Sequence, residues 1–170
     1  NLGLAGAFQT GMKYAFKKGY DAAIQFDGDG QHRPEYIESM VKTMEDEKMD
    51  IVIGSRFVSK KKGLSPRMLG SRVISFLILL TTGKCVKDPT SGMRLYGKNV
   101  LEEFANKINY GPEPDTITYL LNRGCKIKEV QVEMDERIAG TSYLNFIGSI
   151  RYMVKMCTSI IFVQWFRKRS

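Results

Sequence analysis

The sequence is poor in the side chains on which several common kinds of site depend. It has one histidine, His32, and three cysteines, Cys85, Cys125 and Cys157. The cysteines are odd in number and widely spaced, so they match no zinc or disulfide pattern and favour a reducing compartment. A histidine-based catalytic triad or a histidine-rich metal site would have to be built around His32 alone.

Long hydrophobic runs and leader signals are also missing. No signal peptide is recognisable, and no apolar stretch reaches the ~18–20 residues that a membrane span needs. The chain lacks an initiator methionine and begins Asn1-Leu2-Gly3, as if inside a domain, which predicts a fragment. Its 170 residues, 43% of them hydrophobic, are enough for one domain with a real core.

Acidic residues are scarce in the middle and at the end of the chain, whose net charge is +8. Residues 1–55 hold six Lys/Arg and nine Asp/Glu, whereas residues 56–94 hold nine Lys/Arg and one acid, Asp88. The last twenty residues hold five Lys/Arg and no acid. This distribution predicts a polyanionic partner, either nucleic acid or an anionic membrane surface. Because no nucleic-acid recognition motif accompanies the charge, we do not expect nucleic acid.

Hydrophobic patterning switches between helical and strand periods along the chain. It predicts helices over 4–18, 34–47, 67–82, 98–106, 115–123 and 145–168, and strands over 20–26, 50–54 and 126–134. A strand, a helix and a strand in this order imply a parallel, right-handed βαβ unit. The fold class is therefore α/β, with a mostly parallel sheet flanked by helices.

An acidic cluster follows the first predicted strand. Asp27 and Asp29 lie one residue apart, and side chains at i and i+2 of an extended segment point the same way, so both carboxylates can converge on one point. Gln31 can add an amide oxygen. Such an all-oxygen set suits Mg²⁺ or Mn²⁺. The alternative is an ordinary Asp-Gly turn after a strand.

Two charged residues downstream are further candidates. Arg56 follows the second strand and is expected at the same sheet edge as Asp27, where a cation is typical of a phosphate contact; the alternative is an ion pair with a surface acid. Asp88 is either a catalytic or orienting carboxylate or a turn-initiating residue paired with Arg94. The run Lys60-Lys61-Lys62 between them is typical of a solvated loop.

Two of the predicted helices are unusually apolar. The helix over 67–82 is apolar nearly all round, which predicts that it is fully buried or lies partly in lipid. The helix over 145–168 is basic and amphipathic, with Trp165 and Phe166 beside Lys and Arg, a signature of membrane interfaces. The alternative is a C-terminal helix packed on the domain. We therefore divide the chain into a domain over 1–144 and an amphipathic membrane-interface helix over 145–170.

Together these segments resemble a known family, the GT-A glycosyltransferases of family 2, in the branch of dolichol-phosphate mannose synthase and bacterial polyprenyl-phosphate glycosyltransferases. The resemblance runs from residue 1 to about residue 150. It rests on five segments in this order, residues 1–3, 26–34, 53–56, 88–94 and 137–142. It implies a GT-A (Rossmann-like) fold that is incomplete at the N-terminus, because the strands that hold the nucleotide in relatives are absent.

The resemblance also implies roles for individual residues. Asp27 and Asp29 would be the carboxylates of the DxD motif, binding Mg²⁺ or Mn²⁺ and the donor diphosphate, with Gln31 as third metal ligand. The residues that fall where relatives bind the acceptor phosphate or the donor diphosphate are Arg56, Arg67, Ser71 and Arg137. Asp88 falls where relatives carry a functionally important acid and is the candidate catalytic residue. On the residues alone, Arg137 has an alternative, a salt bridge to a neighbouring acid.

The implied reaction is the metal-dependent, inverting transfer of a sugar from a UDP- or GDP-sugar to a polyprenyl phosphate at the cytoplasmic side of the cell membrane. A phosphate monoester has its second pKa near ~6 and is mostly anionic at neutral pH. Its attack therefore needs no strong base, which suits a chain with one histidine. The alternatives are a transferase with a saccharide or protein acceptor, which needs a base more, and an inactive anion-binding module. A homo-oligomer is left open.

Overall fold

The computed structural model describes residues 3–135 and 146–163. The helices are α1 (Gly3–Lys17), α2 (Tyr36–Glu47), α3 (Pro66–Thr82), α4 (Lys98–Asn106), α5 (Pro114–Asn122) and α6 (Phe146–Thr158), which a π-helical segment, η1 (Ser159–Val163), continues. The strands are β1 (Ala22–Gln25), β2 (Ile51–Ser55), β3 (Arg94–Gly97) and β4 (Ile127–Gln131). The predicted elements within the described ranges are present, and the predicted α/β class is confirmed.

The four strands form one sheet in the order β1-β3-β2-β4. Strands β2 and β4 are parallel neighbours, while β3 lies between β1 and β2 and is antiparallel to both. Strands β1 and β2 therefore run in the same direction, as predicted, but they are not adjacent. No strand is predicted over 94–97, because four residues that begin with an arginine give no strand-like apolar pattern.

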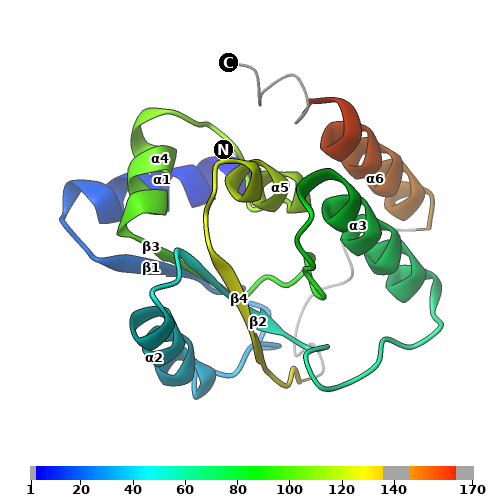
Figure 1. Ribbon diagram of the computed structural model, residues 1–170, viewed down its shortest axis with the longest axis horizontal. Coiled ribbons are helices and arrows are strands. Elements are labelled where there is room, and N and C mark those ends of the chain that lie inside the picture. The colour runs from blue at the N-terminus through cyan, green and yellow to red at the C-terminus, as the bar shows by residue number, and fades with distance from the viewer. Residues whose placement is uncertain (1–2, 136–145, 164–170) are drawn as a thin grey trace.

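Strand β2 is buried on both faces, which explains its uninterrupted apolar sequence. Ile51 and Ile53 face a large core built with α1, α3, α4, α5 and α6. Val52, between them, faces a smaller core that contains Met40 of α2. Figure 1 shows the resulting layers, with α2 on one side of the sheet and α1, α4 and α5 on the other. The carboxyl ends of β1, β2 and β4 consequently lie at one edge of the sheet.

Helix α3 has clear start and stop signals in the sequence. The Ser65 hydroxyl accepts a hydrogen bond from the Met68 N–H (3.3 Å), and Pro66 occupies the first turn. Gly83 ends the helix with φ +69°, a conformation that glycine adopts without strain, and its N–H donates to the Leu79 carbonyl. The helix therefore begins one residue before the predicted start at residue 67 and ends at the predicted residue 82.

The C-terminal helix packs on the domain along one side. Met156 of α6 and Ile160 of η1 are 1% exposed, and the Ser159 hydroxyl donates to the Asp115 carboxylate (2.6 Å). Gly70 of α3 permits close contact, since a β-carbon there would lie 2.8 Å from the Met153 sulfur. Within the described residues, no helix is both long enough and apolar enough to cross a membrane.

Candidate functional site

A buried ion pair joins Arg56 and Asp88 at the carboxyl edge of the sheet. The Asp88 side chain is fully buried and accepts hydrogen bonds from Arg56 Nε (2.7 Å), Arg56 Nη2 (2.8 Å) and the Arg56 backbone N–H (3.1 Å). The Thr90 hydroxyl adds a fourth (3.2 Å). The bidentate geometry fixes both the acid and the guanidinium.

This arrangement corrects the alternative partners considered from the sequence. Asp88 does not pair with Arg94, because Arg94 is itself buried and donates to the backbone carbonyls of Pro89 (2.7 Å) and Pro112 (3.1 Å). The partner of Arg56 is a buried acid, not a surface one. About a fifth of the Arg56 side chain remains exposed, so its guanidinium still reaches the surface at this edge.

The environment of Asp88 suits an orienting carboxylate better than a base. Burial alone raises its pKa, but the hydrogen bonds and charge of Arg56 outweigh burial and hold the pKa of Asp88 below its ordinary value. The carboxylate is therefore ionised at neutral pH, and four donors already occupy it. A general base needs a free lone pair within reach of the proton that it takes.

Glu129 of β4 fixes the backbone that carries Asp88. Its two carboxylate oxygens accept the N–H groups of Lys87 (2.7 Å) and Asp88 (2.7 Å). The sequence predicts no role for Glu129, and the one signal that could have indicated it is an acid that interrupts the alternating pattern of a strand. Glu129, Asp88 and Arg56 thus form a chain of charge-assisted contacts that crosses from β4 to the end of β2.

Replacing Glu129 by glutamine should lower the free energy of unfolding by about 1–3 kcal/mol, because one backbone N–H would face an amide NH₂ in place of an oxygen. Urea denaturation followed by circular dichroism measures the change. Glu133→Gln, four residues on and exposed, is the matched control and should cause only a small change. Equal midpoints for Glu129→Gln and the unaltered chain would contradict the positioning role of Glu129.

The Asp27 carboxylate lies against the loop that contains Asp88. It packs on the backbone of Gly92, where a β-carbon would overlap its Oδ2 atom. His32 Nε2 is 3.7 Å from the same oxygen, and this imidazole lowers the pKa of Asp27 against the opposing effect of partial burial. His32 is itself buried. The two acidic motifs, far apart in the sequence, are therefore in direct contact.

Asp29 and Gln31 lie in the turn after β1. The Asp29 Oδ1 atom accepts the Gln31 N–H (3.1 Å), as in an Asx turn. The Gln31 side-chain amide donates to the Asp135 carbonyl (3.4 Å), and His32 forms an antiparallel bridge with Met134. The turn is thus tied to the segment that follows β4.

The donor chemistry of this turn fits a hard divalent cation. Mg²⁺ is commonly held by one or two carboxylates together with substrate phosphates and water, and the partly exposed carboxylates of Asp27 and Asp29 offer that set. Residues 3–135 and 146–163 contain no group of three or more His, Cys, Asp or Glu side chains that could hold a metal by themselves. A metal here would complete its coordination with other oxygens, from Gln31, substrate or water.

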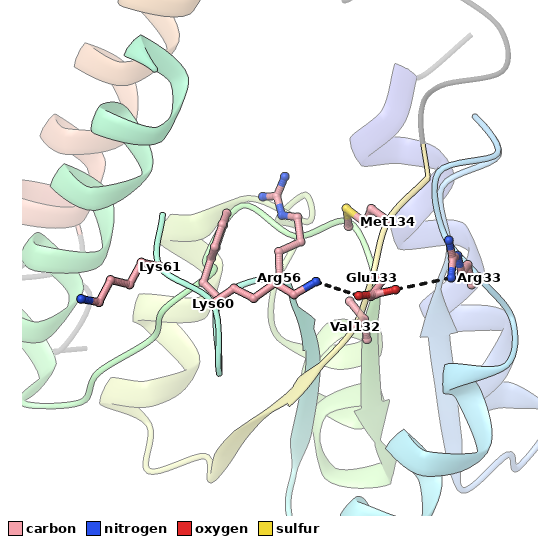
Figure 2. Close-up of a pocket in the computed structure, with 8 residues that line it drawn as sticks. Arg33, Arg56, Lys60, Lys61, Val132, Glu133 and Met134 are labelled. Atoms are coloured by element: carbon pink, nitrogen blue, oxygen red, sulfur yellow. Dashed lines mark hydrogen bonds and ion pairs between the residues drawn. The ribbon is translucent and has the colours of Figure 1, made fainter. Parts of the chain in front are cut away.

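A basic pocket of about 410 Å³ opens beside the ion pair. The charged residues that line it are Arg33, Arg56, Lys60, Lys61 and Glu133. Figure 2 shows Lys60 and Arg33 approaching Glu133 from opposite sides, at 2.7 Å and 3.7 Å, while Lys61 points away. The lining residues comprise four cations and one acid. Arg33, Arg56 and Lys60 are ion-paired with Asp135, Asp88 and Glu133, so an anionic ligand would share these cations with their acids.

The remaining candidates are divided between described and undescribed parts of the chain. Ser71 lies in α3, is 3% exposed and accepts a hydrogen bond from Lys62 Nζ (2.8 Å). Arg67 also belongs to α3, but its side chain lies outside the described residues, as does all of Arg137. The expectation that the run Lys60-Lys61-Lys62 is solvated holds for Lys60 and Lys61, which are exposed, and is wrong for Lys62, which is half-buried.

The described residues form an α/β domain with charged side chains at the carboxyl edge of its sheet. The sequence profile of Glycosyl transferase family 2 matches residues 1–105, and the chain belongs to this family. Enzymes of the family often use divalent metals.

Several relatives carry names that refer to lipid-linked sugars. The chain is 32% identical over 111 residues to the UDP-N-acetylglucosamine--dolichyl-phosphate N-acetylglucosaminyltransferase of Methanococcus voltae. The aligned region covers 64% of this chain and 44% of the relative. It is 27% identical to a polyprenol monophosphomannose synthase of Mycolicibacterium smegmatis (84% and 56% covered). It is 29% identical to an undecaprenyl-phosphate mannosyltransferase of Micrococcus luteus (84% and 61%). The chain spans about half the length of the curated relatives it matches.

Proposed function

We propose that this chain belongs to an enzyme that transfers a sugar from a nucleotide-sugar donor to a polyprenyl phosphate at a membrane surface. The observation that carries the proposal is the meeting of Asp27 with the loop of Asp88, beside Arg56 and the basic pocket, at one sheet edge. Donor diphosphate and acceptor phosphate both require such concentrated positive charge. The names of the relatives point to the same substrate classes.

The residues divide the chemistry between them. In the proposed reaction an acceptor phosphate oxygen attacks the anomeric carbon, the bond to the donor diphosphate breaks, and single displacement inverts the configuration. Asp27 and Asp29, with Gln31, would hold Mg²⁺ or Mn²⁺, which supplies positive charge to the leaving diphosphate. Arg56 supplies further charge and is held in place by Asp88. Stabilisation of the leaving group is then mainly electrostatic.

The transfer assay separates this function from its rivals. The chain is incubated with a radiolabelled UDP- or GDP-sugar, Mn²⁺, and either a polyprenyl phosphate in vesicles or a water-soluble saccharide or peptide. We expect labelled lipid, and none after chelation with EDTA. Transfer to the soluble acceptor alone would overturn the lipid acceptor, and binding of anions without any transfer would support an inactive module.

The membrane-surface part of the proposal is supported by two adjacent helices. Large apolar side chains point outward from α3, α6 and η1, namely Leu69, Val73, Phe76, Leu79, Leu80, Ile150, Val154, Ile161 and Phe162. Helices α3 and α6 lie side by side (Figure 1), and the apolar side chains that they and η1 expose are here called the α3–α6 face. Exposed lysines and arginines nearby, such as Arg151 and Lys155, suit anionic lipid headgroups.

Placing aspartate at both Phe76 and Val154 should weaken binding to anionic liposomes at least ~10-fold, because two large apolar contacts are lost and negative charge is added. Sedimentation with phosphatidylglycerol vesicles measures the partition. Leu4→Asp on α1, an equally exposed leucine distant in sequence, is the control and should sediment like the unaltered chain. Equal sedimentation of all three proteins would refute the α3–α6 face as the membrane contact.

A further inference from the structure

Lys62 is a half-buried cation beside Ser71. Its Nζ donates to the hydroxyls of Ser71 (2.8 Å) and Ser75 (3.2 Å) and lies 5.3 Å from the centre of the Phe57 ring. Arg72 donates to the Lys62 carbonyl (2.6 Å), which fixes the backbone of the loop. The fold therefore holds this ammonium against the first turns of α3, unlike the exposed Lys60 and Lys61.

The ammonium has neutral partners only. Within residues 3–135 and 146–163, no carboxylate oxygen lies within 4.0 Å of it in an ion pair. The two acids that influence it are engaged elsewhere, because Asp88 binds Arg56 and Glu129 binds backbone N–H groups. A desolvated cation without an anionic partner is costly. The lowered pKa of Lys62, due mainly to burial, agrees with this lack of compensation.

An anion at Ser71 would complete the charge balance. Arg56 lies 5.1 Å from the same Phe57 ring that Lys62 contacts, so both cations flank one aromatic side chain. Arg72 adds a third positive charge close by. A phosphate monoester carries up to two negative charges and several acceptor oxygens, which matches an ammonium and hydroxyls that donate together.

We propose that Lys62 is a further ligand of the acceptor phosphate, donating from its ammonium to a phosphate monoester bound at Ser71. The inference rests on the proposed function and adds to it a residue from the loop before α3. On binding, the Lys62 ammonium exchanges its contact with the Ser71 hydroxyl for a phosphate oxygen, and that hydroxyl is released to donate to the same phosphate. Lys62 thus acts in acceptor affinity, separately from the donor diphosphate at Asp27.

The test is calorimetric titration of the chain with farnesyl phosphate, a short polyprenyl phosphate, with inorganic phosphate and farnesol as comparisons. The Lys62→Met variant should bind farnesyl phosphate ~10–100-fold more weakly, since a hydrogen bond between charged groups is lost. Lys61→Met, the exposed neighbour, should bind within ~2-fold of the unaltered chain. Lys62→Arg should restore most of the affinity because it keeps the charge.

A pH series distinguishes a ligand from a merely structural lysine. Asp88 and Glu129 raise the pKa of Lys62, whereas burial, Arg56 and Arg72 lower it, and the net shift is downward. As pH rises toward the ordinary lysine value of about 10.4, the amine loses its charge, so the affinity for farnesyl phosphate should fall. Lys62→Arg stays charged and should show a smaller decline, a readout that holds even where Lys62→Met folds poorly.

The outcomes separate this inference from the proposed function. If the unaltered chain binds farnesyl phosphate no better than farnesol, the lipid-phosphate acceptor itself is wrong. If it binds farnesyl phosphate tightly and Lys62→Met binds equally well, the assignment of Lys62 alone is overturned. If inorganic phosphate binds as tightly as farnesyl phosphate and depends on Lys62, the site takes free phosphate and the lipid acceptor is overturned.

Discussion

Replacing Asp88 by alanine is expected to lower the free energy of unfolding by about 3–5 kcal/mol, because the mutation leaves the guanidinium of Arg56 in a mostly buried position without its anion. Guanidinium denaturation at neutral pH measures the loss. Removing both charges in an Arg56→Met, Asp88→Leu double variant should cost less than Asp88→Ala alone, since no charge is then left unpaired. A double variant that loses as much stability as Asp88→Ala, or more, would contradict direct coupling of the two charges.

The loss of unfolding free energy on removal of the Asp88 charge should also depend on pH. Because the pKa of Asp88 is depressed in the folded chain, its ionised form contributes stability above the ordinary aspartate value of about 3.9, and this contribution is lost as pH falls through the folded pKa. The difference between the unaltered chain and Asp88→Asn should therefore be largest near neutral pH and shrink on acidification. A difference that stays constant down to acidic pH would show that the ion pair is not its source.

Replacing Gly92 by alanine is expected to weaken Mn²⁺ binding ~10–100-fold, the usual effect of disturbing the surroundings of a metal ligand. The new β-carbon would occupy the position of Asp27 Oδ2 and displace that carboxylate. Electron paramagnetic resonance of Mn²⁺ in the presence of a nucleoside diphosphate measures the affinity. Stability should change little, because the displaced group is the end of a partly exposed side chain.

Two variants control the Gly92 experiment. Gly11→Ala, in α1 with open space around its β-carbon, should keep the Mn²⁺ affinity unchanged. Asp27→Asn should lose affinity to a similar degree as Gly92→Ala. If Asp27→Asn binds Mn²⁺ like the unaltered chain, the metal role of Asp27 is wrong; if only Gly92→Ala does, the contact with Gly92 does not position the carboxylate.

The sequence predicts the helices and strands that have a strong hydrophobic period. It does not predict elements whose burial depends on tertiary contacts. The apolar run of β2 identifies a buried strand, and the apolar pattern over 67–82 identifies α3. Strand β3 escapes prediction because the burial of Arg94 depends on carbonyls of Pro89 and Pro112, which only the fold brings to it. Local pattern carries no information on such partners.

In the candidate site, too, some positions can be predicted from the sequence and others cannot. The sequence predicts that Asp27 and Arg56 lie at the same edge of the sheet, because each follows a strand and the carboxyl ends of parallel strands meet at one edge. The partner of Asp88 is not predictable, because the nearest cation along the chain, Arg94, is engaged by other groups. Lys62 looks like its two neighbours in the sequence, and only the packing of its loop on α3 separates it from them.

The position of β3 has a consequence for how the chain reaches this structure. Strand β1, which carries the acidic turn, is joined to the rest of the sheet by pairing of Ala22–Gln25 with Arg94–Gly97, segments far apart in the sequence. Closing so long a loop costs chain entropy before the pairing is gained, and proteins rich in such non-local contacts fold slowly. We therefore expect the acidic turn to assemble late, after β3 has docked on β2, so that this edge is among the last parts of the sheet to form during folding.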